Sequence, residues 1–337
     1  MDLSTTYLGL HLKSPLMPGA SPLVDDMDLV RRLEDANAAA IVMHSLFEEQ
    51  ITGERFATIY HMELYADSYA EAASYFPRHD DYPLGPEQYL AHIDRIKRAV
   101  SIPVIGSLNG ATPGGWTEYA RLIEQAGADA LELNTYYVAT DPQETGFAVE
   151  QRILEVVRSV VDTVSIPVAV KVSPFFSSFA NFAARLDEAG VDGIVMFNRF
   201  YQPDIDIETL DVKPTLRLSD SSELLLRLRW LAILARQISA NLCVTGGVHS
   251  STDAVKSIMA GADAVQIVSA VLRHGPEYLL ILERGLRQWM EENGYASVRQ
   301  MRGSLSLSTC PDAQAFERAN YVRTLHSFAG FQRVTRP

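Results

Sequence analysis

The fold is decided by a short pattern that occurs three times, QAGADALELN at 125–134, EAGVDGIVMFN at 188–198 and MAGADAVQIV at 259–268. In each copy a glycine follows a helical stretch, and an apolar run follows an aspartate. Glycine adopts the left-handed backbone conformation that closes a helix, and a continuous apolar run suits a strand covered on both faces. A weaker copy at 35–44, DANAAAIVMH, has Asn37 in the glycine position. Each copy therefore predicts a helix end followed by a buried strand.

A second pattern alternates with the first along the chain. Its members are SIPVIGS at 101–107, SIPVAVK at 165–171, the looser ANLCVTG at 240–246 and the opening SPLMP at 14–18. Proline is tolerated at the first residue of a strand, so this pattern also predicts strands. Together the two patterns predict eight strands, separated by amphipathic segments that are long enough for crossover helices. These segments are 116–125, 149–164, 179–189 and 252–260.

Strands and helices that alternate eight times predict an α/β fold of the (β/α)8 TIM-barrel type. An open doubly wound sheet is the alternative, because closure of a sheet leaves no periodic signal. Residues 3–13 alternate like a short hairpin and are expected to plug the bottom of the barrel. Long connections follow the second and sixth strands, at 45–90 and 199–223, and such loops often act as lids. We treat residues 1–337 as one barrel domain with a C-terminal extension from about residue 295.

The composition is that of a globular domain with no charged-polymer or membrane partner. Hydrophobic residues make up 47% of the 337 residues and charged residues 21%, so the whole length can bury a core. The formal net charge is −13 and no run of Lys or Arg occurs, which argues against a nucleic-acid partner. No stretch is apolar over the roughly 18 residues that a membrane span needs. Cys243 and Cys310 are the only cysteines and residues 1–25 lack a secretory signal pattern, so we expect a cytoplasmic protein without disulfides.

Two glycines at the end of the seventh strand predict an anion site. Gly246 and Gly247 allow a close approach of the backbone, and Val268 and Ser269 end the eighth strand. In barrels of this type the loops after the last two strands form the usual phosphate site. A simple tight turn is the alternative interpretation of the glycines. The position of Ser269 after the eighth strand favours the phosphate site.

Lys171 ends the fifth strand, where its side chain would point into the mouth of an apolar barrel. Burial of a lysine there costs free energy unless an anionic partner is present. Three interpretations stay open: a Schiff-base nucleophile, a positive charge beside an electron-rich cofactor ring, and a rim lysine that reaches water.

Three asparagines end other strands of the same rim. Asn109, Asn134 and Asn198 follow the third, fourth and sixth strands. Any one of them could be a turn residue or a cap. Three on one rim predict recognition of a flat ring that bears amide or carbonyl groups.

These residues, in this order, carry a resemblance to a known family. It extends through 8–21 (LGLHLKSPLMPGAS), 103–109 (PVIGSLN), 131–134 (LELN), Lys171, Asn198, 245–247 (TGG) and 266–270 (QIVSA). The chain resembles the soluble class-1 branch of the dihydroorotate dehydrogenase family, whose members are FMN-dependent barrels. The resemblance implies that Ala20 and Ser21 lie against the flavin, Lys171 near its N1 and C2 oxygen, and Asn134 and Asn198 near substrate and ring. It assigns further cofactor contacts to Asn109, Gly246, Gly247, Val268 and Ser269.

The sequence departs from that family at the catalytic residues. Family members follow the strand-four Asn with Leu-Ser-Cys-Pro-Asn, whose Cys removes the C5 proton of dihydroorotate; here Tyr137 takes the Cys position and Ala139 that of the second Asn. His44 stands where the family has a Lys, and residues 71–77 (EAASYFP) replace a segment that holds orotate. A tyrosine has a pKa of about 10 and is a poor base near neutral pH. The nearest replacements for the absent base are Tyr136, Tyr137, His44 and Ser45.

We therefore expect an FMN-dependent oxidoreductase that acts on a CH–CH group of dihydroorotate or a related substrate, in pyrimidine biosynthesis if the substrate is dihydroorotate. One alternative is a flavin-free barrel enzyme that binds a phosphorylated metabolite and uses Lys171 as its nucleophile. A second alternative is a non-catalytic FMN-binding barrel. The expected partners are a small-molecule substrate and an electron acceptor that the residues do not identify, with a homodimer as a family-level expectation. No metal site is predicted, because no cysteine cluster or zinc-like histidine spacing occurs.

Overall fold

The computed structural model of the chain describes residues 1–47, 86–109, 113–199, 204–208, 210–213, 217–310 and 312–327. Parallel strands form one sheet that closes almost fully into a barrel, in the order β3-β13-β12-β9-β8-β7-β6-β4. These strands are β3 (Leu16–Pro18), β4 (Ile41–Val42), β6 (Val104–Asn109), β7 (Ala130–Asn134), β8 (Val168–Val172), β9 (Gly193–Met196), β12 (Asn241–Thr245) and β13 (Ala264–Ile267). The two ends of this strand order, β3 and β4, meet where the Ala39 N–H, just before β4, donates to the Leu16 carbonyl oxygen of β3 at 2.9 Å. The predicted (β/α)8 barrel is confirmed, and the open sheet is excluded.

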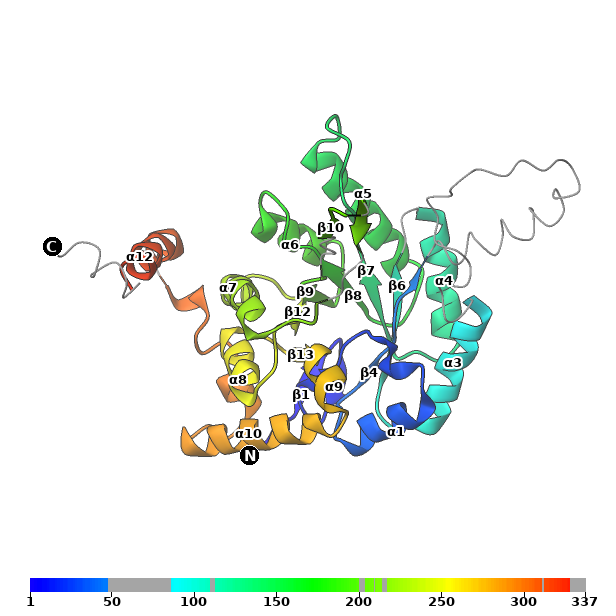
Figure 1. Ribbon diagram of the computed structural model, residues 1–337, viewed down its shortest axis with the longest axis horizontal. Helices are drawn as coiled ribbons and strands as arrows, with labels where there is room; N and C mark the ends of the chain where they lie inside the picture. The colour runs from blue at the N-terminus through cyan, green and yellow to red at the C-terminus, as the bar shows by residue number, and fades with distance from the viewer. Residues whose placement is uncertain are drawn as a thin grey trace, which may run out of the picture.

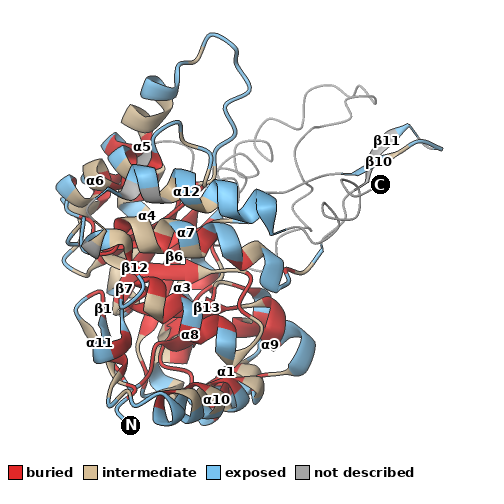
Figure 2. Cartoon of the chain, turned by 90° about the vertical axis from the view of Figure 1, so that its left-hand side faces the viewer, coloured by how far each residue is buried: buried red, intermediate tan, exposed pale blue. Residues whose placement is uncertain are grey.

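Helices surround the barrel (Figure 1). They are α1 (Met27–Asp35), α3 (Pro86–Ala99), α4 (Pro113–Gln125), α5 (Gly146–Val161), α6 (Phe179–Glu188), α7 (Leu224–Leu234), α8 (Ser251–Ala260), α9 (Ser269–His274) and α10 (Tyr278–Glu292). The four crossover helices predicted from amphipathic segments correspond to α4, α5, α6 and α8. In α5, for example, Ile153, Leu154, Val157 and Val160 recur at helical spacing and are buried. Buried residues accordingly concentrate in the strands and on the inner helix faces (Figure 2).

The glycines of the repeated pattern close helices as predicted. Gly127, Gly190 and Gly261 have φ angles of 94°, 88° and 133°, and Asn37 in the weaker copy has a φ of 64°. Side chains rarely adopt this left-handed conformation, which asparagine tolerates best. The pattern therefore reflects a backbone requirement at each helix end.

The repeated aspartates have a structural role that the pattern alone did not reveal. Each carboxylate accepts a hydrogen bond from the backbone N–H near the start of a neighbouring strand. The pairs are Asp129 with Val104 at 2.7 Å, Asp192 with Val168 at 2.8 Å and Asp263 with Leu242 at 2.9 Å. These bonds satisfy N–H groups at the bottom of the barrel and fix neighbouring strands relative to one another.

A short hairpin plugs the bottom of the barrel, as predicted. Strands β1 (Thr5–Tyr7) and β2 (Leu10–Leu12) pair antiparallel. Tyr7, Leu8 and Leu12 are buried in one cluster with residues of the barrel interior such as Ala169 and Val195. Gly193 is required there, because a Cβ atom at this position would lie 2.6 Å from Leu8 Cδ2.

The connections after the second and sixth strands are only partly described. Strand β5 (Leu46–Phe47) pairs with β6, and residues 48–85, which include 71–77, lie outside the described residues. In the connection after β9, β10 (Asp204–Asp206) and β11 (Asp211–Lys213) form an antiparallel hairpin. A 3-10 turn at Ser221–Glu223 then leads into α7.

The extension beyond α10 contains α11 (Val298–Met301), a 3-10 turn at Leu307–Thr309 and α12 (Ala313–His326). Arg229 of α7 forms an ion pair with Glu317 of α12. Cys243 and Cys310 are both free thiols. None of the helices in the described ranges is long and apolar enough to cross a bilayer.

Candidate functional site

A buried ion pair lies inside the barrel between two neighbouring strands. Lys171 Nζ of β8 lies 2.7 Å from Glu132 Oε1 of β7, with 8% and 1% of the two side chains exposed. The second carboxylate oxygen, Glu132 Oε2, accepts a hydrogen bond from Gln266 Nε2 of β13 at 2.6 Å. Glu132 is thus the anionic partner that burial of Lys171 requires. Because Lys171 is buried, it does not reach water as a rim lysine would.

The negative charge of Glu132 also raises the pKa values of two other buried groups, the Cys243 thiol and the Tyr7 phenol. Burial raises the pKa of the Cys243 thiol, and the Glu132 carboxylate raises it further. Burial likewise raises the pKa of the Tyr7 phenol, with the Glu132 charge contributing. Cys243 and Tyr7 are therefore neutral at physiological pH, and neither supplies a base or a thiolate.

A chain of side-chain hydrogen bonds crosses the rim at the C-terminal ends of the strands. Asn198 Nδ2 donates to Asn134 Oδ1 at 2.5 Å, and Asn134 Nδ2 donates to Ser45 Oγ at 3.4 Å. Ser45 Oγ in turn lies 2.8 Å from Ser107 Oγ. Two of the three predicted asparagines are thereby brought together. Asn109, the third, is buried at the end of β6.

His44 lies at the same rim, directly before Ser45. Its Nδ1 lies 2.7 Å from Asp25 Oδ1, and its ring packs edge-on against Tyr89 at 5.1 Å between centroids. Tyr89 Oη donates to the carbonyl oxygen of His44 at 2.9 Å, which fixes the backbone there. Burial lowers the pKa of His44 below 6.5, although the Asp25 carboxylate partly offsets this effect. The lowered pKa favours the neutral imidazole near pH 7, and its Nδ1 lies against the Asp25 carboxylate.

The loop predicted to bind phosphate brings polar groups together around Ser219. Gly247 N–H donates to Ser219 Oγ at 3.3 Å, and that oxygen also lies 2.9 Å from Ser269 Oγ and 3.2 Å from His249 Nε2. Gly246 and Gly247 have φ angles of 83° and 80°. The left-handed backbone therefore favours glycine at both positions, and Ser219 connects Gly247 to Ser269.

His249 completes this group of polar residues. Burial lowers the pKa of His249, and the positive charge of Arg273 lowers it further. Arg273 itself reaches toward the carbonyl oxygen of Leu218 at 3.4 Å, next to Ser219. Arg273 thus adds a positive charge beside these polar groups, while the Asp253 carboxylate accepts the His249 N–H at 3.1 Å on the other side.

Two buried polar atoms near the ends of neighbouring strands have no hydrogen-bond partner within the described part of the chain. They are Ser21 Oγ, just after β3, and Gln266 Oε1, in β13. The two strands pair directly, with Gln266 opposite Met17. Ala20, the other residue expected beside a flavin, directly precedes Ser21 and is partly buried. Polar atoms left without a partner in this way are typical of a ligand site.

Tyr137 is placed differently from the rim residues described above. Its side chain is 40% exposed, and its hydroxyl donates to Glu144 Oε2 at 2.8 Å. The Arg152 guanidinium lies 4.7 Å from the centre of the Tyr137 ring. Tyr136 is partly exposed beside it, and Ala139 is exposed. The connection after β7 therefore turns the Tyr137 phenol toward α5.

Sequence reasoning missed Glu132, Gln266, Asp25 and Ser219. For Glu132 and Gln266 a signal existed, because each is a polar residue inside an otherwise apolar strand. Glu132 also precedes Asn134 by two residues, so strand alternation places both on the same face. Asp25 and Ser219 lie in connections between regular elements. The sequence there has no hydrophobic period from which the direction of a side chain could be predicted.

The barrel thus has a buried lysine, two bonded amides at its rim and a glycine loop with polar side chains after its last two strands. The sequence profile of the dihydroorotate dehydrogenase family matches residues 2–290. The chain therefore belongs to the dihydroorotate dehydrogenase family, and it is a dihydroorotate dehydrogenase-like oxidoreductase.

Relatives with this name span nearly the whole chain. Over 312 residues the chain is 28% identical to the catalytic subunit of dihydroorotate dehydrogenase B (NAD(+)) from Thermoplasma volcanium, which covers 90% of this chain and 98% of that protein. The protein of the same name from Pyrococcus abyssi is 28% identical over 313 residues, with 89% and 98% covered. That from Methanosarcina mazei is 27% identical over 308 residues, with 89% and 94% covered.

Proposed function

We propose that this chain is an FMN-dependent oxidoreductase that takes hydride from a CH–CH group of dihydroorotate or a closely related ring. The observation that carries the proposal is the buried Lys171, held by Glu132 at 2.7 Å, in a barrel whose neighbouring strands β3 and β13 also present Ser21 Oγ and Gln266 Oε1 without a partner among the described residues. FMN, when bound, supplies a ring that accepts the hydride. Family membership supports the choice of this cofactor.

The residues present fit FMN. A buried polar atom without a partner costs about 1–3 kcal/mol, and a ring with carbonyl and N–H groups would satisfy Ser21 Oγ and Gln266 Oε1. At the other end, Gly247 N–H, Ser269 Oγ and Ser219 Oγ would bind the phosphate. The residues that we propose hold the cofactor are Ala20, Ser21, Asn109, Asn134, Lys171, Ser219, Gly246, Gly247, Val268 and Ser269.

Lys171 acts in this proposal as a fixed positive charge. Its Nζ is held 2.7 Å from the buried Glu132 carboxylate, whereas a Schiff-base nucleophile needs a nitrogen that is free to attack a carbonyl carbon. The same charge stabilises negative charge that develops on an electron-rich ring. The flavin-free alternative with Lys171 as nucleophile is therefore the weaker proposal.

Removal of hydride from one carbon must be matched by removal of a proton from its neighbour. We propose His44 as the group that accepts the proton. Asp25 faces its Nδ1, so a proton on Nδ1 leaves Nε2 as the acceptor, and the lowered pKa keeps the ring neutral near pH 7. Tyr137 is the alternative base, but its hydroxyl donates to Glu144.

Asn134 and Asn198 would bind the substrate. Their mutual hydrogen bond and the bond from Asn134 to Ser45 fix the orientation of both amides before a substrate arrives. Amides held in this way can pair with the carbonyl and N–H groups of a flat ring.

The names of the relatives support one further part of the proposal. They are catalytic subunits of an enzyme named for NAD(+), so we propose that this chain passes its electrons to a separate acceptor, with NAD(+) as one candidate. A homodimer in the cytoplasm is part of the same proposal.

The test is the visible spectrum of the purified protein, with identification of the cofactor released on denaturation. A flavin band from stoichiometric FMN is the expected result. A colourless protein that cannot be reconstituted with FMN would instead support the flavin-free barrel. A yellow protein that no dihydropyrimidine bleaches would support the non-catalytic FMN-binding barrel.

A further inference from the structure

A second pocket lies at the opposite end of the barrel from the proposed flavin site. It has a volume of about 270 Å³ and is lined by residues at the start of β12, including Asn241 and Leu242, and by the loop that follows α7. Gly246 and Gly247 lie beyond the other end of the same strand, β12. The length of the barrel therefore separates the two sites.

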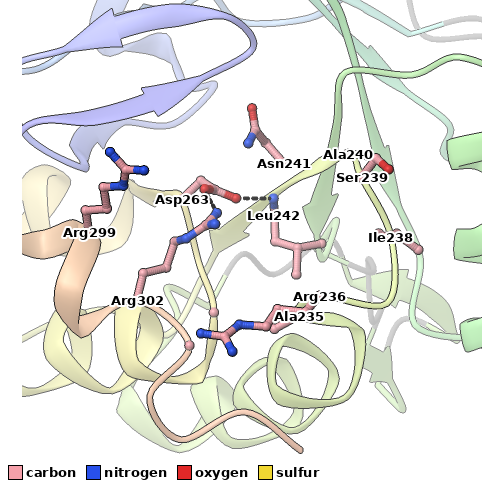
Figure 3. A pocket seen from close by; sticks show the side chains of 12 residues that line it. Ala235, Arg236, Ile238, Ser239, Ala240, Asn241, Leu242, Asp263, Arg299 and Arg302 are labelled. Carbon is pink, nitrogen blue, oxygen red and sulfur yellow. Dashed lines mark hydrogen bonds and ion pairs between the residues drawn. The ribbon is translucent and has the colours of Figure 1, made fainter. Parts of the chain in front are cut away.

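Three arginines line this pocket, namely Arg236, Arg299 and Arg302 (Figure 3). Arg302 forms an ion pair with Asp263, whose other oxygen accepts the Leu242 N–H at 2.9 Å. Within the described ranges, neither Arg236 nor Arg299 has a carboxylate within ion-pair distance. The pocket wall therefore carries an excess of two positive charges in a chain whose formal net charge is −13.

One further carboxylate lies close to the pocket wall. Asp187 accepts hydrogen bonds from the N–H groups of Ser239 and Ala240, at 3.0 and 2.7 Å, and its charge lowers the local excess from two positive charges to one. Asn241 Oδ1 of the side-chain amide accepts the Leu8 N–H at 2.8 Å, which leaves Nδ2 of the same amide as a donor. Burial lowers the pKa of Arg302, and the charge of Arg236 lowers it further, so the guanidinium groups repel one another.

The backbone of Arg236 gives an independent reason to regard its side chain as functional. Arg236 directly follows α7 and its cap, and its φ is 67°. Glycine or asparagine closes a helix in this conformation at lower cost. An arginine at this position is therefore explained by its side chain, which lines the pocket.

We propose that this pocket binds a phosphate group, either as a free anion or as the end of a phosphomonoester. A dianionic phosphate presents three terminal oxygens and can engage three guanidinium groups at once, whereas a carboxylate has two oxygens. The volume of about 270 Å³ holds a phosphate or diphosphate but not a whole nucleotide. The inference does not depend on the flavin or on the proposed oxidoreductase activity.

The experiment is calorimetric titration of the purified full-length protein with inorganic phosphate, pyrophosphate and ribose 5-phosphate at low salt. We compare the wild type with Arg236→Asn, which tolerates the left-handed backbone, and with Arg299→Gln. Each variant should weaken binding about tenfold, the loss expected for one charge-assisted contact. Arg284→Gln on α10 is the matched control, because it removes an exposed arginine outside the pocket and should bind like the wild type.

The proposed flavin-phosphate loop is a competing site, so Ser269→Ala is titrated as well. Binding that is lost in the two pocket variants but kept in Ser269→Ala supports the inference. Uptake of inorganic phosphate alone identifies a free anion, and uptake of ribose 5-phosphate as well identifies a phosphomonoester. The inference is overturned if no probe binds, or if binding depends on Ser269 and not on the arginines. Thermal unfolding of each variant excludes loss of the fold as the cause.

Discussion

Replacing Lys171 with methionine should both destabilise the fold and slow substrate oxidation. Lys171 and Glu132 are 2.7 Å apart, and at most 8% of either side chain is exposed. The variant leaves the Glu132 carboxylate buried with Gln266 as its remaining side-chain donor. Loss of one partner of a buried pair costs about 3–5 kcal/mol, whereas methionine replaces most of the lost volume. We therefore expect the free energy of unfolding to fall by about 3–5 kcal/mol.

Urea unfolding measures this change, and a second substitution separates charge from packing. Adding Glu132→Gln to Lys171→Met removes the uncompensated charge and should restore most of the stability. Lys97→Met is the matched control. Lys97 lies 2.6 Å from Asp129, but about 30% of each side chain is exposed, so that loss should be about 1 kcal/mol or less.

The rate of flavin reduction should respond differently from stability. Loss of one preorganised charge beside the reacting ring slows a reaction by about 10²-fold. Glu132→Gln should not repair that loss, because the positive charge is still absent. An unfolding free energy equal to that of the wild type, or a double variant that reduces flavin at the wild-type rate, would refute the reasoning.

Further predictions concern the base, its pKa and the phosphate loop. His44→Phe should slow anaerobic flavin reduction by about 10²-fold, while Tyr137→Phe should leave it nearly unchanged; the reverse order would identify Tyr137 as the base. The reaction needs neutral His44, so its rate should rise with pH through a pKa below 6.5. Asp25→Asn removes a charge that raises this pKa, and a pH–rate profile should show the rise moved to lower pH; a shift upward would contradict the pairing. Gly247→Ala places a Cβ 2.5 Å from the first backbone nitrogen of α7 at a φ of 80°, so it should lower stability and the FMN content after purification, whereas Gly146→Ala meets nothing within 4 Å and should change neither.

The barrel could be predicted from the sequence because its repeats encode backbone requirements. A helix end that needs a left-handed residue selects glycine at 127, 190 and 261, and asparagine at 37. The apolar runs that follow are buried on both faces, so they contain few polar residues and stand out. The aspartate in each repeat is also visible in the sequence. Its hydrogen bond to a neighbouring strand could not be predicted, because hydrophobic periodicity does not show which strands pair.

The site could be predicted only in part. Strand ends are fixed by the repeats, and residues such as Lys171, Asn134 and Asn198 follow from them. Their partners come from elsewhere in the chain: Asp25 beside His44 and Ser219 beside Gly247 lie in connections without a regular pattern. The direction of the Tyr137 side chain likewise depends on the turn after β7, which a sequence position cannot give.

The central claim is that the barrel oxidises a dihydropyrimidine with a bound flavin, and anaerobic addition of dihydroorotate to the purified, FMN-loaded protein tests it most directly. The account predicts that the visible flavin band bleaches in the wild type and bleaches far more slowly in His44→Phe. A flavin that stays oxidised with dihydroorotate and with related dihydropyrimidines at every pH, yet is reduced by dithionite, would contradict the claim.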